Sequence, residues 1–221
     1  MRYRCLVIDH DDTVVNSTET IHYPCFISFM AMQGRDMREE VPIEKYLEYN
    51  CLGNIMEFYL DKVGLSQELL DEETLYWRDC VNNYVPKAYE GIREILTRFR
   101  KLGGKIYVAS HSESRFILRD CKENGLPTPD GIFGYDAPSG LRKPSPKIID
   151  TIIAKTGISR EEILVVDDLK HGFELAKNSG VAFAAAGWGY SVPRVEALMR
   201  SVADYYLKSG SDLDNLLFSQ S

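Results

Sequence analysis

Residues 5–13, CLVIDHDDT, carry the pattern that decides the fold, a short apolar run that ends in a cluster of acids. Cys5–Ile8 has the length and composition of a buried strand, and Asp9, Asp11 and Asp12 follow it at once. Carboxylates this close together repel one another and resist removal from water. The stretch therefore predicts either a solvated turn or a strand end at which a cation offsets the negative charge.

Four later apolar runs look like further strands of the same sheet. They cover residues 105–109, 131–133, 163–166 and 181–185, and amphipathic segments of helical length lie between them. Strands that alternate with helices favour right-handed crossovers. The pattern predicts an α/β fold with a doubly wound, Rossmann-like, mostly parallel sheet. The polar tail, Ser209–Ser221, is expected to dock loosely or fray.

Residues 17–86 break this alternation, because they show helical periodicity without a convincing strand. We interpret them as a helical-bundle cap inserted after the first strand. The predicted domains are a core of residues 1–16 and 87–221 and a cap of residues 17–86. The expected cap helices are Ile21–Met32, Ile43–Leu52, Asn54–Val63 and Leu69–Val85.

Charge and cysteine content limit the classes of function. The 221-residue chain has a formal net charge of -7, which argues against a general binder of nucleic acid or of acidic membrane surfaces. Its five cysteines are scattered, and we expect reduced thiols in a cytoplasmic protein. No apolar run is long enough to span a bilayer, and the chain does not begin with a signal peptide pattern. The oligomeric state is not readable from the sequence.

Polar side chains follow the predicted strands at the edge where open α/β sheets bind ligands. Carboxylates that come from two strands and meet at one crevice describe a site for a hard divalent cation such as Mg²⁺. A hydroxyl and an ammonium beside them would suit the oxygens of a phosphate group. The residues are Asp9 and Asp11 after the first strand, Ser110 and His111 after the second, Lys143 after the third, and Asp167 and Asp168 after the fourth.

This set of residue types suits phosphoryl transfer through a covalent intermediate. One carboxylate can attack phosphorus and form an aspartyl-phosphate. A second carboxylate two residues further along an extended backbone points the same way, so it can protonate the leaving oxygen and later activate water. Asp9 and Asp11 have this spacing.

The motifs DHDDT at residues 9–13, Ser110, Lys143-Pro144 and Asp167-Asp168 resemble, in order, the four signatures of the haloacid dehalogenase-like (HAD) hydrolase superfamily. The likeness covers nearly the whole chain, including a helical cap of the phosphoglycolate phosphatase and β-phosphoglucomutase type. It implies that Asp9 is the nucleophile and a Mg²⁺ ligand. It also implies that Asp11 is the general acid and base, with its backbone carbonyl on the metal.

The resemblance implies roles for the other motif residues as well. Ser110 would bind the phosphoryl group with help from the backbone of His111. Lys143 would pair with the nucleophile and the phosphoryl group, and Asp168 would ligate Mg²⁺ with support from Asp167. The implied activity is Mg²⁺-dependent hydrolysis of a small phosphorylated metabolite, phosphoglycolate-like or a sugar phosphate. A phosphomutase of the β-phosphoglucomutase type and a catalytically retired phosphate-binding protein remain alternatives.

Some positions depart from the family pattern. Asp12 stands where many relatives have glycine, and His10 stands where they have a bulky apolar residue. Gly172 occupies a position at which some relatives carry another acid. None of the four histidines has the spacing of metal ligands. By position His10 and His111 lie beside the predicted site, whereas we expect surface or packing roles for His22 and His171.

Overall fold

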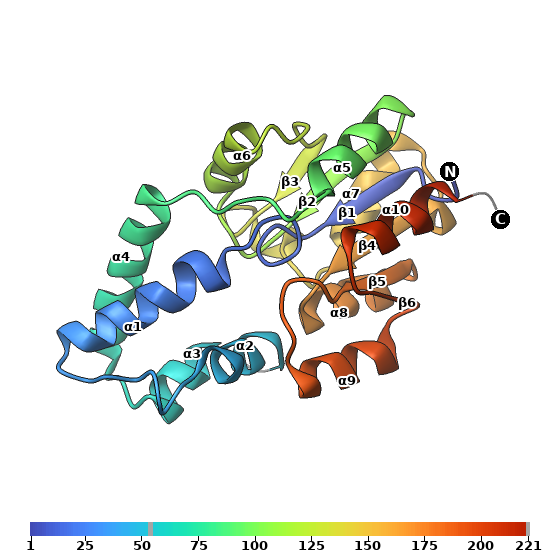
Figure 1. Cartoon of the computed structure of the whole chain (residues 1–221). Helices are drawn as coiled ribbons and strands as arrows, with labels where there is room; N and C mark the ends of the chain where they lie inside the picture. Colours follow the sequence, from blue (N-terminus) through green and yellow to red (C-terminus); the bar gives the residue numbers. More distant parts are fainter. Residues whose placement is uncertain (53–54, 220–221) are drawn as a thin grey trace.

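The computed structural model describes residues 1–52 and 55–219, and its centre is a six-stranded parallel sheet (Figure 1). The strand order is β3-β2-β1-β4-β5-β6. This is the doubly wound order, in which strands are added outward from β1 on one side and from β4 on the other. The predicted α/β class with a Rossmann-like sheet is confirmed. The strands are β1 (Cys5–Ile8), β2 (Lys105–Ala109), β3 (Gly131–Phe133), β4 (Ile163–Asp167), β5 (Ala182–Ala186) and β6 (Tyr205–Leu207).

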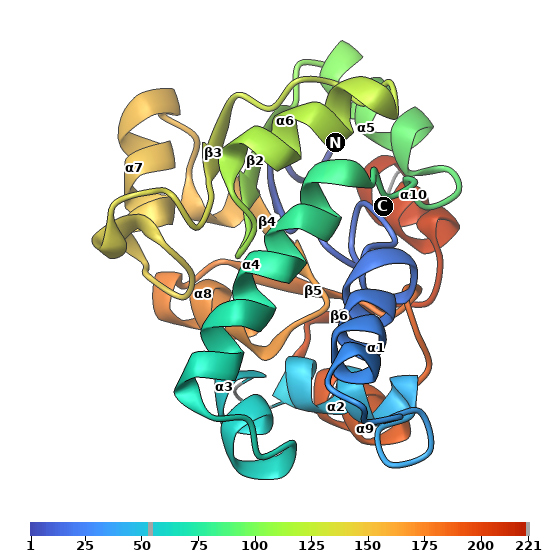
Figure 2. The same cartoon turned by 90° about the vertical axis from the view of Figure 1, so that its left-hand side faces the viewer.

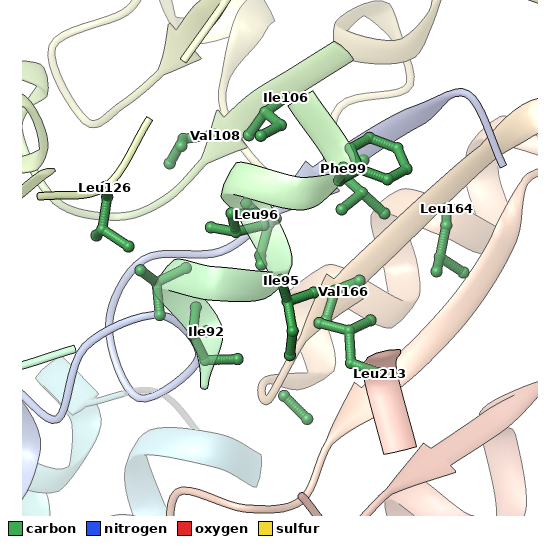
Figure 3. Packing of buried hydrophobic residues seen from close by; sticks show 14 of the residues in the cluster. Ile92, Ile95, Leu96, Phe99, Ile106, Val108, Leu126, Leu164, Val166 and Leu213 are labelled. Atoms are coloured by element: carbon green, nitrogen blue, oxygen red, sulfur yellow. The ribbon is translucent and has the colours of Figure 1, made fainter. Parts of the chain in front are cut away.

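Both faces of the sheet are covered by helices because its strands are apolar on both sides. Side chains alternate along each strand, so Leu6 and Ile8 join one buried cluster while Cys5 and Val7 join the other. Figure 3 shows the first cluster around Phe99 and Val166. Helices α5 (Ile92–Lys101), α6 (Ser114–Glu123) and α10 (Gly210–Phe218) cover this first face, and α7 (Lys147–Thr156), α8 (Lys170–Ser179) and α9 (Pro193–Val202) cover the second.

The expectation of a loose C-terminal tail was wrong. Residues 210–218 form helix α10, whose Leu213 and Leu217 are fully buried against the first face. Figure 3 labels Leu213 within this cluster. The Ser209 hydroxyl accepts a hydrogen bond from the backbone N–H of Asp212 and caps the helix. Two leucines four positions apart provide the apolar stripe that docks it. Strand β6 was not predicted either.

The segment between β1 and α5 is helical and lies to one side of the sheet (Figures 1 and 2). It has an aromatic cluster of its own, in which Phe26 contacts Tyr46 and Phe58. Of the predicted helix Asn54–Val63, Asn54 lies outside the described residues. The helices are a π-helical turn (Thr18–His22) that continues into α1 (Tyr23–Met32), then α2 (Ile43–Leu52), α3 (Ile55–Glu57), a second π-helical turn (Phe58–Lys62) and α4 (Gln67–Asn83).

All five cysteines are free thiols, and Cys80 is the one that is only partly buried. Among the described residues, no helix combines the length and the apolar character needed to cross a membrane.

Candidate active site

Three carboxylates from two neighbouring strands converge at the carboxyl edge of the sheet. Strand β1 pairs with β4 so that Ile8 lies opposite Val166, and the Asp9 N–H donates to the Val166 carbonyl at 2.9 Å. This register brings one oxygen from each of Asp9, Asp167 and Asp168 within 4.8 Å of the others. The edge lies where the doubly wound sheet reverses its strand order, the usual ligand crevice of such folds.

Lys143 lies between two of these acids. Its Nζ donates to Asp9 Oδ1 at 2.8 Å and to Asp167 Oδ2 at 2.7 Å, and its side chain is fully buried. Burial opposes a charge on the amine, but the two carboxylates outweigh it and raise the pKa of Lys143 above its usual value. The lysine is therefore a fixed positive charge beside Asp9. A cis peptide bond joins it to Pro144.

The three carboxylates carry more negative charge than the single ammonium of Lys143 offsets. Burial raises the pKa of Asp167 to about 7, although Lys143 counteracts it. Burial and the carboxylates of Asp9 and Asp167 raise the pKa of Asp168 well above its usual value. A cation among these groups would relieve the repulsion, and a donor set made of carboxylate oxygens fits Mg²⁺.

The side chain of Asp11 lies outside this triad and faces other partners. Its Oδ2 accepts hydrogen bonds from the hydroxyls of Ser112 at 2.6 Å and Ser110 at 3.5 Å. Burial tends to raise the pKa of Asp11, but hydrogen bonds from His22 and Ser112 and the nearby His10 lower it overall. In this arrangement Asp11 is a carboxylate that can accept a proton.

Sequence reasoning missed two contributors from the helical segment, His22 and Trp77. His22 Nε2 lies 3.5 Å from Asp11 Oδ1, and the Trp77 indole donates to His22 Nδ1 at 2.9 Å. Because an indole N–H only donates, Nδ1 is an acceptor and the imidazole proton is on Nε2, facing Asp11. His22 packs against Trp77 as expected, but its contact with Asp11 was not predicted. A lone histidine in a helical insert carries no sequence signal for such a contact.

The second predicted strand end provides one buried and one exposed residue. Ser110 is buried, and its Oγ accepts the Ser112 N–H at 3.1 Å beside Asp11. The ring of His111 is exposed and packs edge-on against His171, with 5.1 Å between ring centroids. The structure thus places Ser110 next to Asp11, whereas the ring of His111 packs against His171.

Thr13 links the first and fourth motifs. Its hydroxyl donates to Asp168 Oδ1 at 3.0 Å. Asp12, where relatives have glycine, adopts the left-handed conformation that glycine would favour, with φ of 54°. Its Oδ1 accepts the Thr18 N–H at 3.0 Å, so this carboxylate caps the start of the helical segment rather than entering the site.

The expectation that His10 flanks the site was wrong. Its side chain is buried on the opposite side of the strand end, where Nε2 lies 3.0 Å from Asp120 Oδ2 on α6. The alternation of side chains along an extended backbone explains this, because its neighbours Asp9 and Asp11 point the other way.

Gly172 has a steric reason to lack a side chain, since a Cβ there would lie 2.2 Å from the Cβ of Asp167.

Comparison with known proteins agrees with this geometry. The profile of the haloacid dehalogenase-like hydrolases matches residues 6–186, which include all four motifs. The chain belongs to this family. The resemblance predicted from the motifs is therefore confirmed, and so is the predicted class of enzyme, a hydrolase.

Two curated relatives of this HAD protein span nearly its full length. The pyrophosphatase PpaX of Listeria monocytogenes is 24% identical over 212 residues, which cover 94% of this chain and 93% of that one. The phosphoglycolate phosphatase of Vibrio parahaemolyticus is 25% identical over 219 residues and covers 95% and 94%. The solved structure of a HAD-like hydrolase from Streptococcus pneumoniae superimposes with a TM-score of 0.76 at 16% identity, covering 98% of this chain and 99% of that one, which supports the shared fold.

Proposed function

We propose that this HAD protein is a Mg²⁺-dependent phosphatase that hydrolyses a small phosphorylated metabolite through an aspartyl-phosphate on Asp9. The observation that carries the proposal is the convergence of Asp9, Asp167 and Asp168 around the buried ammonium of Lys143. The relatives named pyrophosphatase and phosphoglycolate phosphatase support the same reaction class. With free thiols throughout, we infer a cytoplasmic enzyme.

In the first step an Asp9 carboxylate oxygen attacks phosphorus, and the bond from phosphorus to the substrate oxygen breaks. Asp11 donates its proton to that leaving oxygen, and the dephosphorylated product departs. The approach of a negatively charged phosphoryl group raises the pKa of Asp11, so the carboxyl can hold this proton when substrate binds. Lys143 offsets the charge on Asp9 and on the phosphoryl oxygens, and Ser110 donates a hydrogen bond to one of them.

In the second step water attacks the phosphorus of the aspartyl-phosphate. Asp11, now a carboxylate, takes a proton from that water, and the bond between phosphorus and Asp9 breaks. Inorganic phosphate leaves and the Asp9 carboxylate is restored. The hydrogen bonds of Asp11 with Ser112 and His22 favour its charged form and suit this base role.

The ion would be held by the carboxylates of Asp9 and Asp168, with Asp167 supporting them and the backbone carbonyl of Asp11 adding an oxygen. When bound, Mg²⁺ supplies positive charge that offsets the charge on the phosphoryl oxygens. We propose that residues 17–86 form a cap that excludes bulk water and contributes to the choice of substrate.

The test is a screen for released phosphate with and without Mg²⁺. The substrates are phosphoglycolate, sugar phosphates, pyrophosphate and nucleoside monophosphates. We expect turnover of at least one of these compounds, abolished by a chelator and restored by Mg²⁺. Conversion of a sugar phosphate to its isomer without phosphate release would indicate a mutase instead. Binding of these compounds without any turnover would indicate a retired binding protein.

Mg²⁺ is expected to raise the melting temperature more at pH 8 than at pH 5.5. Burial raises the folded-state pKa of Asp167 to about 7 from its unfolded value of 3.8. This group therefore stabilises the metal-free protein below its unfolded pKa and loses that contribution as pH rises toward 7. At low pH protons compete with the ion for the carboxylates, whereas at pH 8 the ion offsets the negative charge of the ionised carboxylates. Thermal unfolding with and without Mg²⁺ measures the increment, and equal increments at both pH values would contradict the prediction.

His22→Gln is expected to move the acidic limb of the pH–rate profile toward higher pH. The imidazole lowers the pKa of Asp11, so its loss leaves the base of the second step protonated over a wider range. Measurement of kcat against pH reveals the shift, because hydrolysis of the aspartyl-phosphate contributes to kcat. His171→Gln is the matched control, because His171 contacts the exposed ring of His111 and not Asp11. Identical shifts in both variants would show that the contact with Asp11 is not responsible.

A further inference from the structure

The segment Trp188–Tyr190 follows β5 and contacts both acidic strand ends. The Trp188 indole donates to the Thr13 carbonyl at 3.0 Å, and the Tyr190 hydroxyl donates to Asp168 Oδ2 at 3.0 Å. Between them Gly189 lies so close to the backbone of Asp12 that a Cβ would be 2.6 Å from its carbonyl oxygen. Three consecutive residues thus connect the first and fourth motifs, and none of them belongs to a family signature discussed above.

Tyr190 completes the set of donors around Asp168. Oδ1 accepts from the Thr13 hydroxyl and Oδ2 accepts from Tyr190, so each carboxylate oxygen has one neutral donor. The carboxylate is nearly fully buried, and these two hydrogen bonds fix the rotation of its plane. Partners of this kind orient a ligand and leave lone pairs free for an ion.

The Tyr190 hydroxyl also contacts helix α2 of the inserted segment. Cys51, near the end of α2, contacts this oxygen through its Sγ and is itself buried. Because the single phenolic proton is donated to Asp168, the thiol donates to the phenolic oxygen. A continuous chain of hydrogen bonds therefore runs from α2 through Tyr190 to Asp168, and each bond polarises the next.

Helix α2 lies against α9 at this place, as both views show (Figures 1 and 2). Leu47 and Cys51 of α2 belong to the same apolar cluster as Val192 and Val195. Glu48 of α2 forms an ion pair with Arg194 of α9. The contact between Cys51 and Tyr190 is thus part of a docked surface that joins the helical segment to the core.

We propose that Tyr190 is a positioning residue that orients Asp168 for its cation and couples the docking of α2 to that orientation. The proposal rests on the proposed function, in which Asp168 is a Mg²⁺ ligand. When α2 is docked, Cys51 holds the phenol against Oδ2. When α2 moves away, the phenol loses this partner and its hold on the carboxylate weakens.

The first test measures Mg²⁺ binding by titration calorimetry on the full chain. Tyr190→Phe keeps the ring and removes the hydroxyl, and we expect the Kd for Mg²⁺ to rise about 10-fold. Tyr206→Phe is the matched control. Tyr206 lines a small cavity together with Asp168 and Tyr190, and its substitution is expected to leave the Kd unchanged. The melting temperature of the metal-free protein separates a general loss of packing from a change at the metal site.

The second test replaces Cys51. Cys51→Ala removes the donor and is expected to raise the Kd about 3-fold, whereas Cys51→Ser keeps a donor and should match the wild-type Kd. In the Tyr190→Phe background Cys51→Ala should have no further effect, since the two residues act through one hydroxyl. An unchanged Kd in Tyr190→Phe would overturn the positioning role, and additive effects would overturn the coupling. If the wild-type chain itself binds no Mg²⁺, the proposed function fails instead.

Discussion

Asp9→Asn is expected to lower kcat for phosphate release by more than about 10³-fold, because the substitution removes the attacking oxygen. An asparagine amide has nearly the same size as the carboxylate but is a poor nucleophile. The substitution also removes one negative charge from a buried cluster that holds three carboxylates and one ammonium. The fold is therefore expected to persist. Phosphate release from the best substrate in the screen gives the rate, and thermal unfolding checks the fold.

Asp12→Asn is the matched control, since it makes the same chemical change three residues further along the chain. Asp12 caps the Thr18 N–H from a left-handed backbone conformation, and asparagine is suited to both tasks. Its activity is expected to stay within a few-fold of wild type. If Asp9→Asn hydrolyses phosphate esters at the wild-type rate while folded, Asp9 is not the nucleophile.

The acidic strand ends could be predicted from the sequence because two local facts decide them. The apolar runs before Asp9 and Asp167 have the length of strands, and parallel strands end at a common edge. The alternation of side chains then places Asp9 and Asp11 on one side and His10 on the other, where it meets Asp120. Applying the same alternation to His10 would have corrected the expectation that it flanks the site.

The contributions of His22, Trp77 and Tyr190 could not be predicted, because they depend on packing between separate elements. Trp77 reaches His22 only after α4 packs against the start of α1, and Tyr190 reaches Asp168 from a loop that follows β5. No local spacing in the sequence predicts these contacts. The C-terminal helix was missed for another reason, since the short Leu/Phe pattern within a mostly polar tail is too weak a signal to predict an anchored helix.

The outcome at Asp12 shows how a departure from a family pattern can be structural. Asp12 follows the acidic strand end directly, yet its side chain turns to the helical segment. Burial raises the pKa of Asp12 to about 6 even though the hydrogen bond from Thr18 counteracts it. The backbone accepts the left-handed conformation, which a short polar side chain tolerates. The departure thus concerns how the helical segment begins.

Lys143→Met is expected to lower the free energy of unfolding by about 3 kcal/mol or more at pH 8 and to abolish phosphate release. The methionine fills the space of the buried stem but leaves Asp9 and Asp167 without the ammonium that both carboxylates contact. Removing one partner of a buried ion pair has a cost of this size because an uncompensated charge remains. Chemical denaturation of the metal-free protein measures the change. Lys101→Met, on the exposed end of α5, is the control and should change stability by less than about 0.5 kcal/mol.

The deficit of Lys143→Met should grow as pH rises from about 4 to about 8. In wild type the two carboxylates raise the pKa of Lys143 above its usual value, so its contribution is complete below about 10.4 and constant across this range. In the variant the carboxylate of Asp167 faces Asp9 without a cation, and the folded-state pKa of Asp167, already raised to about 7, rises further. Groups with raised folded-state pKa values stabilise the fold at low pH and lose that contribution as pH rises through those values. A deficit that is the same at pH 5 and pH 8 would mean that the lysine stem, rather than its charge, stabilises this end of the sheet.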